Sequence, residues 1–326
     1  MHRLDPLDHR LLDEFQRDFP LVPQPFAQVA QSLALTEAEV IARLARLQAN
    51  GTVARVGGTV RPNTAGASTL AALAVPDDQI ETVAALVGAE PGVNHSYLRE
   101  DDWNLWFVAT APDAVALDAC LHRISARSGL QVLTLPLLRA FNIDLGFRLS
   151  GQRAALRSDG PVDAAALMPE DRPLLQAMAA GLPLVARPFA AVASDLGWAE
   201  RQVLDRLATL SAARILTRIG VIVRHRAIGW AANAMVVWDI APDRMEVAGH
   251  ALASVPGVTL CYQRQTHPGL WRYGLFAMVH GQSRAEALAV VTKARALPEL
   301  ALADHRILFS TRCFKQTGAL LERAAA

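Results

Sequence analysis

Apolar residues recur every three or four positions in two separate parts of the chain. Two sets of three residues show this spacing, at i, i+4 and i+7: Val40, Leu44 and Leu47, then Val203, Leu207 and Leu210. The spacing places each set on one face of an α-helix. Thr36 and Glu39 have the separation of a capping box at a helix start. The pattern therefore predicts two equivalent amphipathic helices, one in each half of the chain.

The segments that precede these helices are repeated as well. The string "FPLVPQPFAQVA" at 19–30 returns as "LPLVARPFAAVA" at 182–193, with eight of twelve positions identical. Proline in the first turn suits the start of a helix. Each half thus predicts three short helices followed by a small hairpin, "TVARVGGTVRP" or "ILTRIGVIVRH". This is the pattern of a winged helix-turn-helix, which we place at 1–64 and again at 169–227.

The remainder of each half alternates between strand-like and helix-like runs. The order is βαββαβ, which predicts a ferredoxin-like α+β domain with an antiparallel sheet and helices on one face. We place these domains at 65–148 and 228–326, and we interpret the polar segment 149–168 as the linker. A winged helix-turn-helix followed by such a domain resembles the AsnC-type, leucine-responsive regulators. The chain is therefore expected to be a tandem repeat that forms a pseudo-dimer.

The charge pattern argues against a DNA-binding protein. The chain has 32 basic and 31 acidic side chains, for a net charge of +1, whereas a protein that holds a phosphate backbone is usually basic. The helix in the recognition position, 36–49, is neutral as well, since Glu37 and Glu39 balance Arg43 and Arg46. We expect no DNA partner and a structural role for the helical domains.

Cysteine usage and hydropathy indicate a cytoplasmic protein. The three cysteines form no CxxC pair and no metal-ligand spacing, which is typical of a reducing compartment. The charged N-terminal run is unlike a signal peptide, and no apolar run approaches the ~18 residues of a membrane span. No dinucleotide, P-loop, zinc-protease or hydrolase motif is present, so an enzyme of this sequence would work by proton transfer and electrostatics.

One strand-like stretch, "PGVNHSYLRE" at 91–100, carries the most chemistry. Alternate residues of a strand share a face, so His95, Tyr97 and Arg99 are expected on the same side as Val93. The counterpart "PGVTLCYQRQ" repeats the tyrosine and the arginine as Tyr262 and Arg264, with Leu260 in place of histidine. Such a face predicts the wall of a polar cavity; the alternative is a solvated outer face.

Other candidates flank this stretch. The neighbouring strands contain Trp106, a candidate flat contact, and His280, whose counterpart in the first half is Thr110. Each half thus has one histidine, at a different place. The ends of the last strands carry a recurring arginine, Arg139 and Arg312, with Lys315 added in the second half.

The longer strings resemble a known enzyme family. "LDEFQRDFPLVPQPFA", "PGVNHSYLRE" and "FNIDLGF" are similar to one subunit type of the siroheme decarboxylases of haem d1 biosynthesis, and "LPLVARPFAAVA", "PGVTLCYQR" and "ILFSTRCFKQTG" to its partner subunit type. The resemblance covers nearly the whole chain and implies a fusion of two subunits. It implies a carbon–carbon lyase that converts siroheme to 12,18-didecarboxysiroheme. It also implies no cofactor beyond the iron of the substrate, and no DNA binding.

The resemblance gives the candidate residues roles. We expect His95 and His280 to donate protons, or one of them to ligate the substrate iron. The substrate-binding set would hold the ring and its carboxylates in one pocket near the junction of the two sheets: Tyr97, Arg99, Trp106, Tyr262, Arg264, Arg139, Arg312 and Lys315. The partners expected are siroheme and its didecarboxylated product, and pairing of two fused chains as a homodimer is an open alternative. The rival functions are an AsnC-type DNA-binding regulator and a non-catalytic tetrapyrrole carrier or sensor.

Overall fold

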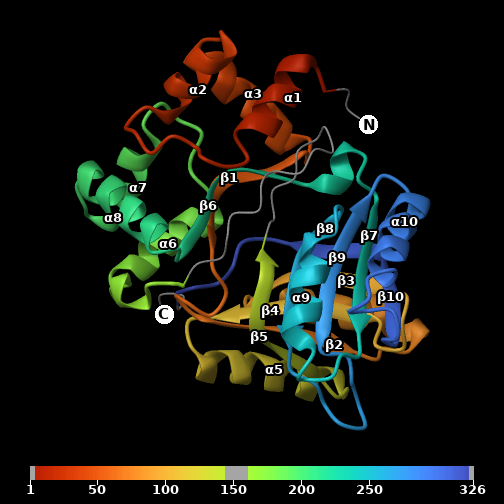
Figure 1. Cartoon of the computed structure of the whole chain (residues 1–326). Helices are drawn as coiled ribbons and strands as arrows, with labels where there is room; N and C mark the ends of the chain where they lie inside the picture. The colour runs from red at the N-terminus through yellow and green to blue at the C-terminus, as the bar shows by residue number, and fades with distance from the viewer. Residues whose placement is uncertain (1–3, 144–160, 323–326) are drawn as a thin grey trace.

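The computed structural model describes residues 4–143 and 161–322 of the chain (Figure 1). The α-helices are α1 Pro6–Glu14, α2 Pro25–Leu33, α3 Glu37–Ala49, α4 Ile80–Ala89, α5 Ala114–Ser128, α6 Asp171–Ala180, α7 Pro188–Leu196, α8 Glu200–Ala212, α9 Met245–Ser254 and α10 Arg284–Arg295. The strands are β1 Val53–Val60, β2 Ala67–Leu73, β3 Val93–Arg99, β4 Leu105–Ala111, β5 Leu133–Ile143, β6 Leu216–Val223, β7 Ala232–Trp238, β8 Val258–Arg264, β9 Leu275–Gly281 and β10 His305–Gln316. Three short 3-10 helices are η1 Asp77–Gln79, η2 Ala164–Ala166 and η3 His225–Ile228.

Both halves contain three helices and a strand, followed by βαββαβ, so the predicted tandem α+β fold is confirmed. The local signals act as expected. Pro25 and Pro188 open α2 and α7, and Thr36 with Glu39 forms the capping box of α3. The predicted domain limit at 64/65 lies between β1 and β2, and the limit at 227/228 lies within η3. Most of the predicted linker 149–168 lies outside the described residues.

The predicted hairpin after each set of helices is wrong. Each half supplies a single strand, and β1 pairs antiparallel with β6 of the other half to form a two-stranded ribbon. The glycines that suggest a turn instead allow the chain to approach closely. A Cβ at Gly220 would lie 2.2 Å from the carbonyl oxygen of Gln16. In Figure 1 the ribbon lies between the helices of the two halves and the barrel.

The two expected sheets are one closed eight-stranded barrel. The strand order is β10-β3-β4-β2-β5-β8-β9-β7. Strand β5 pairs with β2 of its own half and with β8 of the other, and β10 pairs with β7 and with β3. These two last strands are long enough to serve both halves, which is why the sheets merge and leave no free edge.

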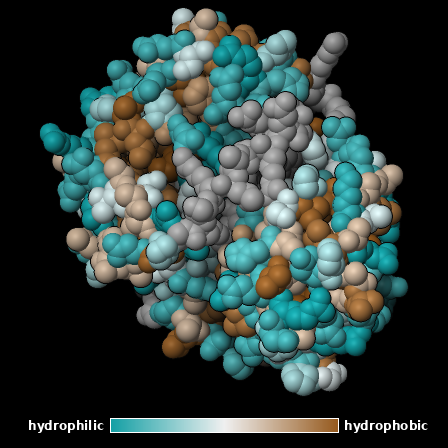
Figure 2. Space-filling view, in the orientation of Figure 1, coloured by the Kyte–Doolittle hydropathy of each residue, from teal (hydrophilic) through white to brown (hydrophobic). Residues whose placement is uncertain are grey.

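Four apolar cores hold the layers together. One belongs to the helices and the ribbon of both halves, and two lie between the barrel and its outer helices. The fourth fills the barrel interior with large side chains such as Trp106 and Phe276. Figure 2 shows hydrophilic residues over much of the visible face, with apolar groups scattered among them. The barrel is therefore a packed scaffold whose polar chemistry is limited to particular places.

Three arginines of the helix-turn-helix units are bound to buried carboxylates. In the first half, Arg43 and Arg46 lie 2.9 and 2.7 Å from Asp8, whose side chain is 1% exposed. In the second half, the fully buried carboxylate of Asp171 accepts from Arg206 Nε at 2.9 Å, and also from the backbone N–H of Met168, which precedes α6. These guanidinium groups tie the helices to one another.

Loss of the Asp171 carboxylate should destabilise the fold. Asp171→Asn removes the charge that faces Arg206, whose side chain is 18% exposed. Breaking a buried pair leaves an uncompensated charge, so we expect the free energy of unfolding to fall by about 3 kcal/mol. Asp205→Asn is the matched control, because its ion pair with Arg201 is exposed, and it should cost less than about 0.5 kcal/mol. Urea unfolding of both variants measures the difference; equal stabilities would contradict the structural role of Asp171.

Candidate active site

The strand β3 carries three of the predicted residues, His95, Tyr97 and Arg99. The expectation that Val93 shares their face is wrong. The register shifts between Val93 and His95, so that Val93 packs in the outer core while Tyr97 stands opposite the inward-facing Trp106. Strand β8 has the same shift after Val258. A β-bulge re-aims the side chains that follow it, and here it turns the polar residues of β3 toward the inside of the barrel.

A polar network connects the two histidines, which come from different halves. The His95 and Tyr97 rings stack with centroids 6.4 Å apart, and the Arg99 guanidinium lies 5.5 Å from the centre of the Tyr97 ring. Arg99 donates from both terminal nitrogens to Asn233 Oδ1 at 3.2 Å. Asn233 Nδ2 lies 2.9 Å from His280 Nε2. Strand sharing through β10 brings these residues together, because β10 lies between β3 and β7 and pairs with both.

The hydrogen bonds define the state of His280. Arg99 is only a donor, so it fixes the Asn233 oxygen toward itself and the amide nitrogen toward His280 Nε2. The amide nitrogen only donates, so His280 Nε2 must accept this hydrogen bond. The other ring nitrogen, Nδ1, lies 2.9 Å from the hydroxyl of Thr259, whose proton is donated to the carbonyl oxygen of Met278 at 3.1 Å. Thr259 thus accepts from Nδ1–H, and the network holds a neutral imidazole.

Burial acts in the same direction on the histidines. The imidazoles of His95 and His280 keep some accessible surface but are surrounded by protein on most sides. This desolvation lowers the pKa of each to about 4, assisted by the charge of Arg55 on His95 and of Arg99 and Arg226 on His280. Burial likewise lowers the pKa of Arg99 to about 10 and raises that of Tyr97 to about 12. At neutral pH the free site thus contains neutral imidazoles beside charged guanidinium groups.

The counterpart residues of the second half lie beside the apolar interior of the barrel. Arg264 stacks on Tyr262 with its guanidinium carbon 5.3 Å from the ring centre, and it donates to the carbonyl oxygen of Leu135 at 2.8 Å. Burial lowers the pKa of Arg264 to about 10. Trp106, also predicted, packs there edge-on against Trp271. Because no histidine stands at the matching positions of β8 and β4, the two ends of the pseudo-symmetric barrel are chemically different.

The structure places three predicted residues outside this network. Arg139 pairs with Glu246 of α9 at 3.3 Å, and Arg312 pairs with Glu81 of α4. Lys315 donates to the carbonyl oxygens of Gly88 and Glu90, where α4 ends. Register shifts in β5 and β10 separate these side chains from the alternation of the preceding strand residues. All three contact the helices outside the barrel.

Sequence reasoning missed four residues that contact the network. Asn233 and Thr259 hold His280, the His225 ring lies 5.9 Å from the His280 ring, and Arg226 donates to the carbonyl oxygen of Ser310 at 2.7 Å. The run "RHR" at 224–226 signals the basic patch, but not its position. Asn233, the second residue of β7, carries no signal in the sequence by itself. Its role depends on its pairing with His280 across β7 and β9.

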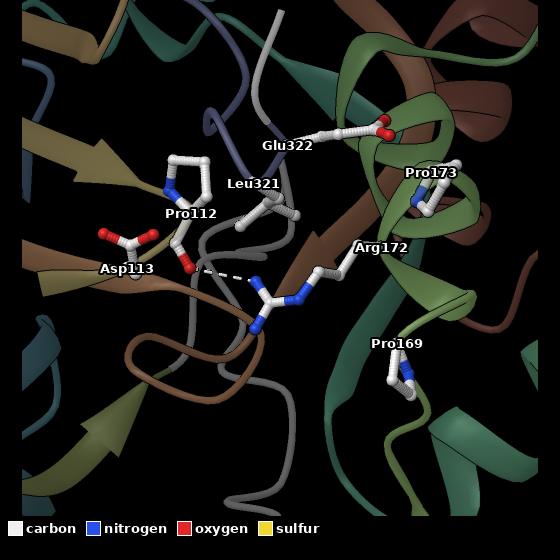
Figure 3. Close-up of a pocket in the computed structure, with 7 residues that line it drawn as sticks. All are labelled: Pro112, Asp113, Pro169, Arg172, Pro173, Leu321 and Glu322. Carbon is white, nitrogen blue, oxygen red and sulfur yellow. Dashed lines mark hydrogen bonds between the residues drawn. The ribbon is translucent and has the colours of Figure 1, made fainter. Parts of the chain in front are cut away.

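A cavity of about 390 Å³ lies away from the network (Figure 3). It is lined by Pro112, Asp113, Pro169, Arg172, Pro173, Leu321 and Glu322. The cation in it, Arg172, donates to the carbonyl oxygen of Pro112 at 2.9 Å and also to that of Ala65. Its charge therefore joins the helical unit to the barrel. Within residues 4–143 and 161–322, no cluster of three or more potential metal ligands is found, and no helix is long and apolar enough to cross a membrane.

Comparison with known proteins defines the class of fold. The family model of the "AsnC-like ligand binding domain" matches residues 65–142 and 227–315, which contain the two halves of the barrel. The family model of the "Siroheme decarboxylase NirDL-like HTH domain" matches residues 8–53 and 171–216, which contain the helix-turn-helix units. The chain is thus a tandem of two AsnC-like units. Its helical domains match those described for siroheme decarboxylases of the NirDL type.

Full-length relatives identify the family. The siroheme decarboxylase NirDL subunit of Paracoccus pantotrophus is 63% identical over 324 residues, which cover 99% of each chain. A crystal structure of the siroheme decarboxylase NirDL matches with a TM-score of 0.67 at 30% identity, over 97% of this chain and 94% of that one. A second crystal structure, of NirDL in complex with an iron-uroporphyrin III analogue, matches with a TM-score of 0.64 at 30% identity, over 94% and 91%. The chain belongs to the siroheme decarboxylase family, and the expected class of enzyme, a carbon–carbon lyase, is confirmed.

The network predicts that Asn233 controls the protonation of His280. In Asn233→Asp a carboxylate would face both Arg99 and His280 Nε2, and it would favour the imidazolium. We expect the pKa of His280 to rise from about 4 to about 6 or higher. Asn233→Ala is the control, because it removes the amide without adding charge, and it should leave the pKa low. NMR titration of the imidazole Cε1–H signals checks this; a pKa unchanged by the aspartate would contradict the network.

Proposed function

We propose that this protein removes CO₂ from the C12 and C18 acetate side chains of siroheme and yields 12,18-didecarboxysiroheme. One observation carries the proposal: His95 and His280, from different halves, belong to one continuous network that includes the cationic Arg99. The network combines proton-carrying groups with a partner for carboxylates. Both are needed to release CO₂ from a side chain and to replace it with hydrogen.

The chemistry of the substrate fits these groups. Siroheme is a flat iron macrocycle with eight carboxylates on its rim. Guanidinium groups bind carboxylates through paired, charge-assisted hydrogen bonds, and Arg99 and Arg226 are charged groups near His280. The relative crystallised with an iron-uroporphyrin III analogue supports a tetrapyrrole of this type. We propose no cofactor other than the iron that arrives within the substrate.

Each decarboxylation consumes one proton. The bond between the side-chain CH₂ and its carboxylate breaks, CO₂ leaves, and the electron pair stays on the carbon side, where the conjugated macrocycle accommodates it. A proton then completes the methyl group, so R–CH₂–CO₂⁻ and H⁺ become R–CH₃ and CO₂. A positioned imidazolium is a suitable donor and typically contributes ~10²–10⁴-fold in rate. Two such steps require two protons.

The free chain holds its imidazoles neutral, so the substrate must cause their protonation. A carboxylate that binds near an imidazole favours the charged form and raises its pKa. A carboxylate bound to Arg99 would also compete with the Asn233 oxygen for that guanidinium. The amide would then be able to turn, so that its oxygen accepts a hydrogen bond from the protonated Nε2–H of His280. In this mechanism the acid forms only when the leaving group is in place.

The neutral state also supports a second role for His95. Its Nδ1 lies 3.0 Å from the side-chain oxygen of Asn94, which accepts, so that Nδ1 carries the proton and Nε2 keeps a lone pair. That lone pair is suited to the iron of the substrate. His280, in contrast, has both nitrogens engaged by Asn233 and Thr259. We therefore keep His280 as the acid and retain both roles, acid or iron ligand, for His95.

The rival functions have less support. In a DNA reader, Arg43, Arg46 and Arg206 would be expected to reach phosphates, whereas here they bind Asp8 and Asp171. We propose that the helical domains do not bind DNA. The free thiols of the three cysteines agree with a cytoplasmic location, which we propose as well. A carrier or sensor would bind the macrocycle without releasing CO₂.

Single replacement of each histidine tests the reaction. The purified chain, incubated anaerobically with siroheme, should give a product lighter by two CO₂ by mass spectrometry. His280→Ala should lower the rate of CO₂ loss by about 10²–10⁴-fold, and His95→Ala should lower it or abolish the iron-ligand signature in the absorbance spectrum. His122→Ala is the control, since this histidine lies exposed on α5. Parental rates in both site variants would refute the assignment, and a coloured complex without CO₂ release would favour the carrier.

The pH dependence should show proton uptake on substrate binding. Because burial holds the pKa of both free imidazoles near 4, the free enzyme must gain a proton before the first chemical step. We expect kcat/KM for this step to fall about tenfold for each pH unit between pH 6 and 8. A steady-state pH series with product quantification measures the slope. A flat profile would indicate that the proton does not come from these imidazoles.

A further inference from the structure

The β1–β6 ribbon carries an arginine at the same place in each half. Arg55 of "TVARVGG" and Arg218 of "ILTRIGV" are equivalent in the repeat. The register pairs Arg55 with Ile222 and Arg218 with Thr59, with Gly57 opposite Gly220 between them. Residues an even number of positions apart share one face of a strand. The two guanidinium stems therefore leave the ribbon on the same face, related by the pseudo-two-fold axis.

Both arginines are half-buried, and buried nitrogens of each guanidinium group lack the partners that a structural arginine has. Nε of Arg55, and Nε and Nη1 of Arg218, have no hydrogen-bond partner among residues 4–143 and 161–322. Burial lowers the pKa of both side chains, that of Arg218 to about 9. The arginines of the neighbouring helices differ, because Arg43 and Arg206 each bind a buried aspartate.

The charges around the pair are of one sign. Arg17 and Arg55 act on Arg218, and Arg55 acts on His95. Arg218 in turn acts on His225, which neighbours His280. Within the described chain, no aspartate or glutamate is among the charges that act on Arg55 or Arg218. The positive charges of Arg55 and Arg218 therefore act on His95 and on His225, the neighbour of His280.

Such an arrangement is costly in the absence of an anion. A buried charge is normally paired, and an unpaired one weakens the fold. Repetition of the same unpaired group in both halves indicates a function rather than a chance defect, since strained or destabilising features concentrate at functional sites. The groups needed to compensate the two guanidiniums are anions that enter with a ligand, and carboxylates match their geometry.

We propose that Arg55 and Arg218 form a second carboxylate-binding element, supplied by the ribbon of the helical domains, that holds the rim of the tetrapyrrole over His95 and His280. The proposal rests on the proposed function and extends it. The ribbon lies between the helices and the barrel (Figure 1), so this element would hold the rim from the side of the helical domains. The helical domains are therefore a half of the substrate site, and their aspartate-bound helices keep the ribbon in position.

A binding titration tests the element independently of catalysis. Iron uroporphyrin III is titrated into the full chain and into Arg55→Met and Arg218→Met, with absorbance as the readout. Each variant should bind about 10- to 100-fold more weakly, because it loses a charge-assisted carboxylate contact. The control is Arg201→Met, whose guanidinium is almost fully exposed on α8, and it should bind as the parent does.

Thermal unfolding separates a binding role from a structural one. Methionine replaces an uncompensated buried charge, so the melting temperature of each free variant should equal or exceed that of the parent. A lower melting temperature with parental affinity would overturn the proposal and make the arginines structural. Should a methionine variant fail to fold, Arg55→Gln and Arg218→Gln replace it, and parental affinity in both would overturn the proposal as well.

The outcomes distinguish the inference from the proposed function. If the parent removes two CO₂ units from siroheme and the arginine variants bind as tightly as the parent, the ribbon element fails alone. If the parent binds iron uroporphyrin III through Arg55 and Arg218 but releases no CO₂, the proposed reaction fails and the element stands. A parent that does not bind the tetrapyrrole would overturn both.

Discussion

The sharing of strands β5 and β10 between the halves is the constraint on which the site depends. Strand β10 pairs with β7 of its own half through residues 305–309 and then with β3 of the other half through residues 310–316. Arg99 therefore reaches Asn233, and through it His280, although Asn233 is 134 positions away in the sequence. Neither half alone would contain this network. Fusion of the halves in one chain keeps their ratio fixed and raises the effective concentration of one half around the other.

The arginines of this chain have two contrasting environments. On the helices, guanidinium groups are bound to buried aspartates and hold the units together. On the ribbon and in β3, guanidinium nitrogens are buried without described partners, beside neutral imidazoles. The first arrangement stabilises a fold, whereas the second destabilises an empty site and favours an anion. In the proposed function, the second set would bind the carboxylates of the macrocycle, while the arginines of the first set stay engaged with aspartates.

Much of the fold follows from local signals, whereas the site depends on pairing that local signals do not contain. The helical spacing of Val40, Leu44 and Leu47, the cap at Thr36 and the order βαββαβ all give the observed elements. The predicted hairpins are wrong because Gly57 and Gly58 resemble a turn, while the partner of β1 lies in the other half. Alternation predicts the shared face of His95, Tyr97 and Arg99, but it places Val93 on the wrong face because a bulge interrupts the strand. The places of Asn233 and Arg218 follow only from strand register and burial, which local sequence signals do not predict.

The two halves differ at the positions to which the proposed mechanism gives proton transfer. Where the second half has Asn233 opposite His280, the first has Ser68 opposite Thr110. Thr259, which accepts from the imidazole, corresponds to Asn94, which holds His95 instead. A symmetric pair of sites would duplicate His280 with its neighbours. The repeat instead keeps one imidazole on each side of a shared network, and it keeps the arginines of β3, β8 and the ribbon in both halves. Carboxylate recognition can follow the pseudo-symmetry of the barrel, because the substrate has carboxylates around its whole rim. Proton delivery cannot follow it in the same way, since each imidazole must be held in its own tautomer by its own neighbours.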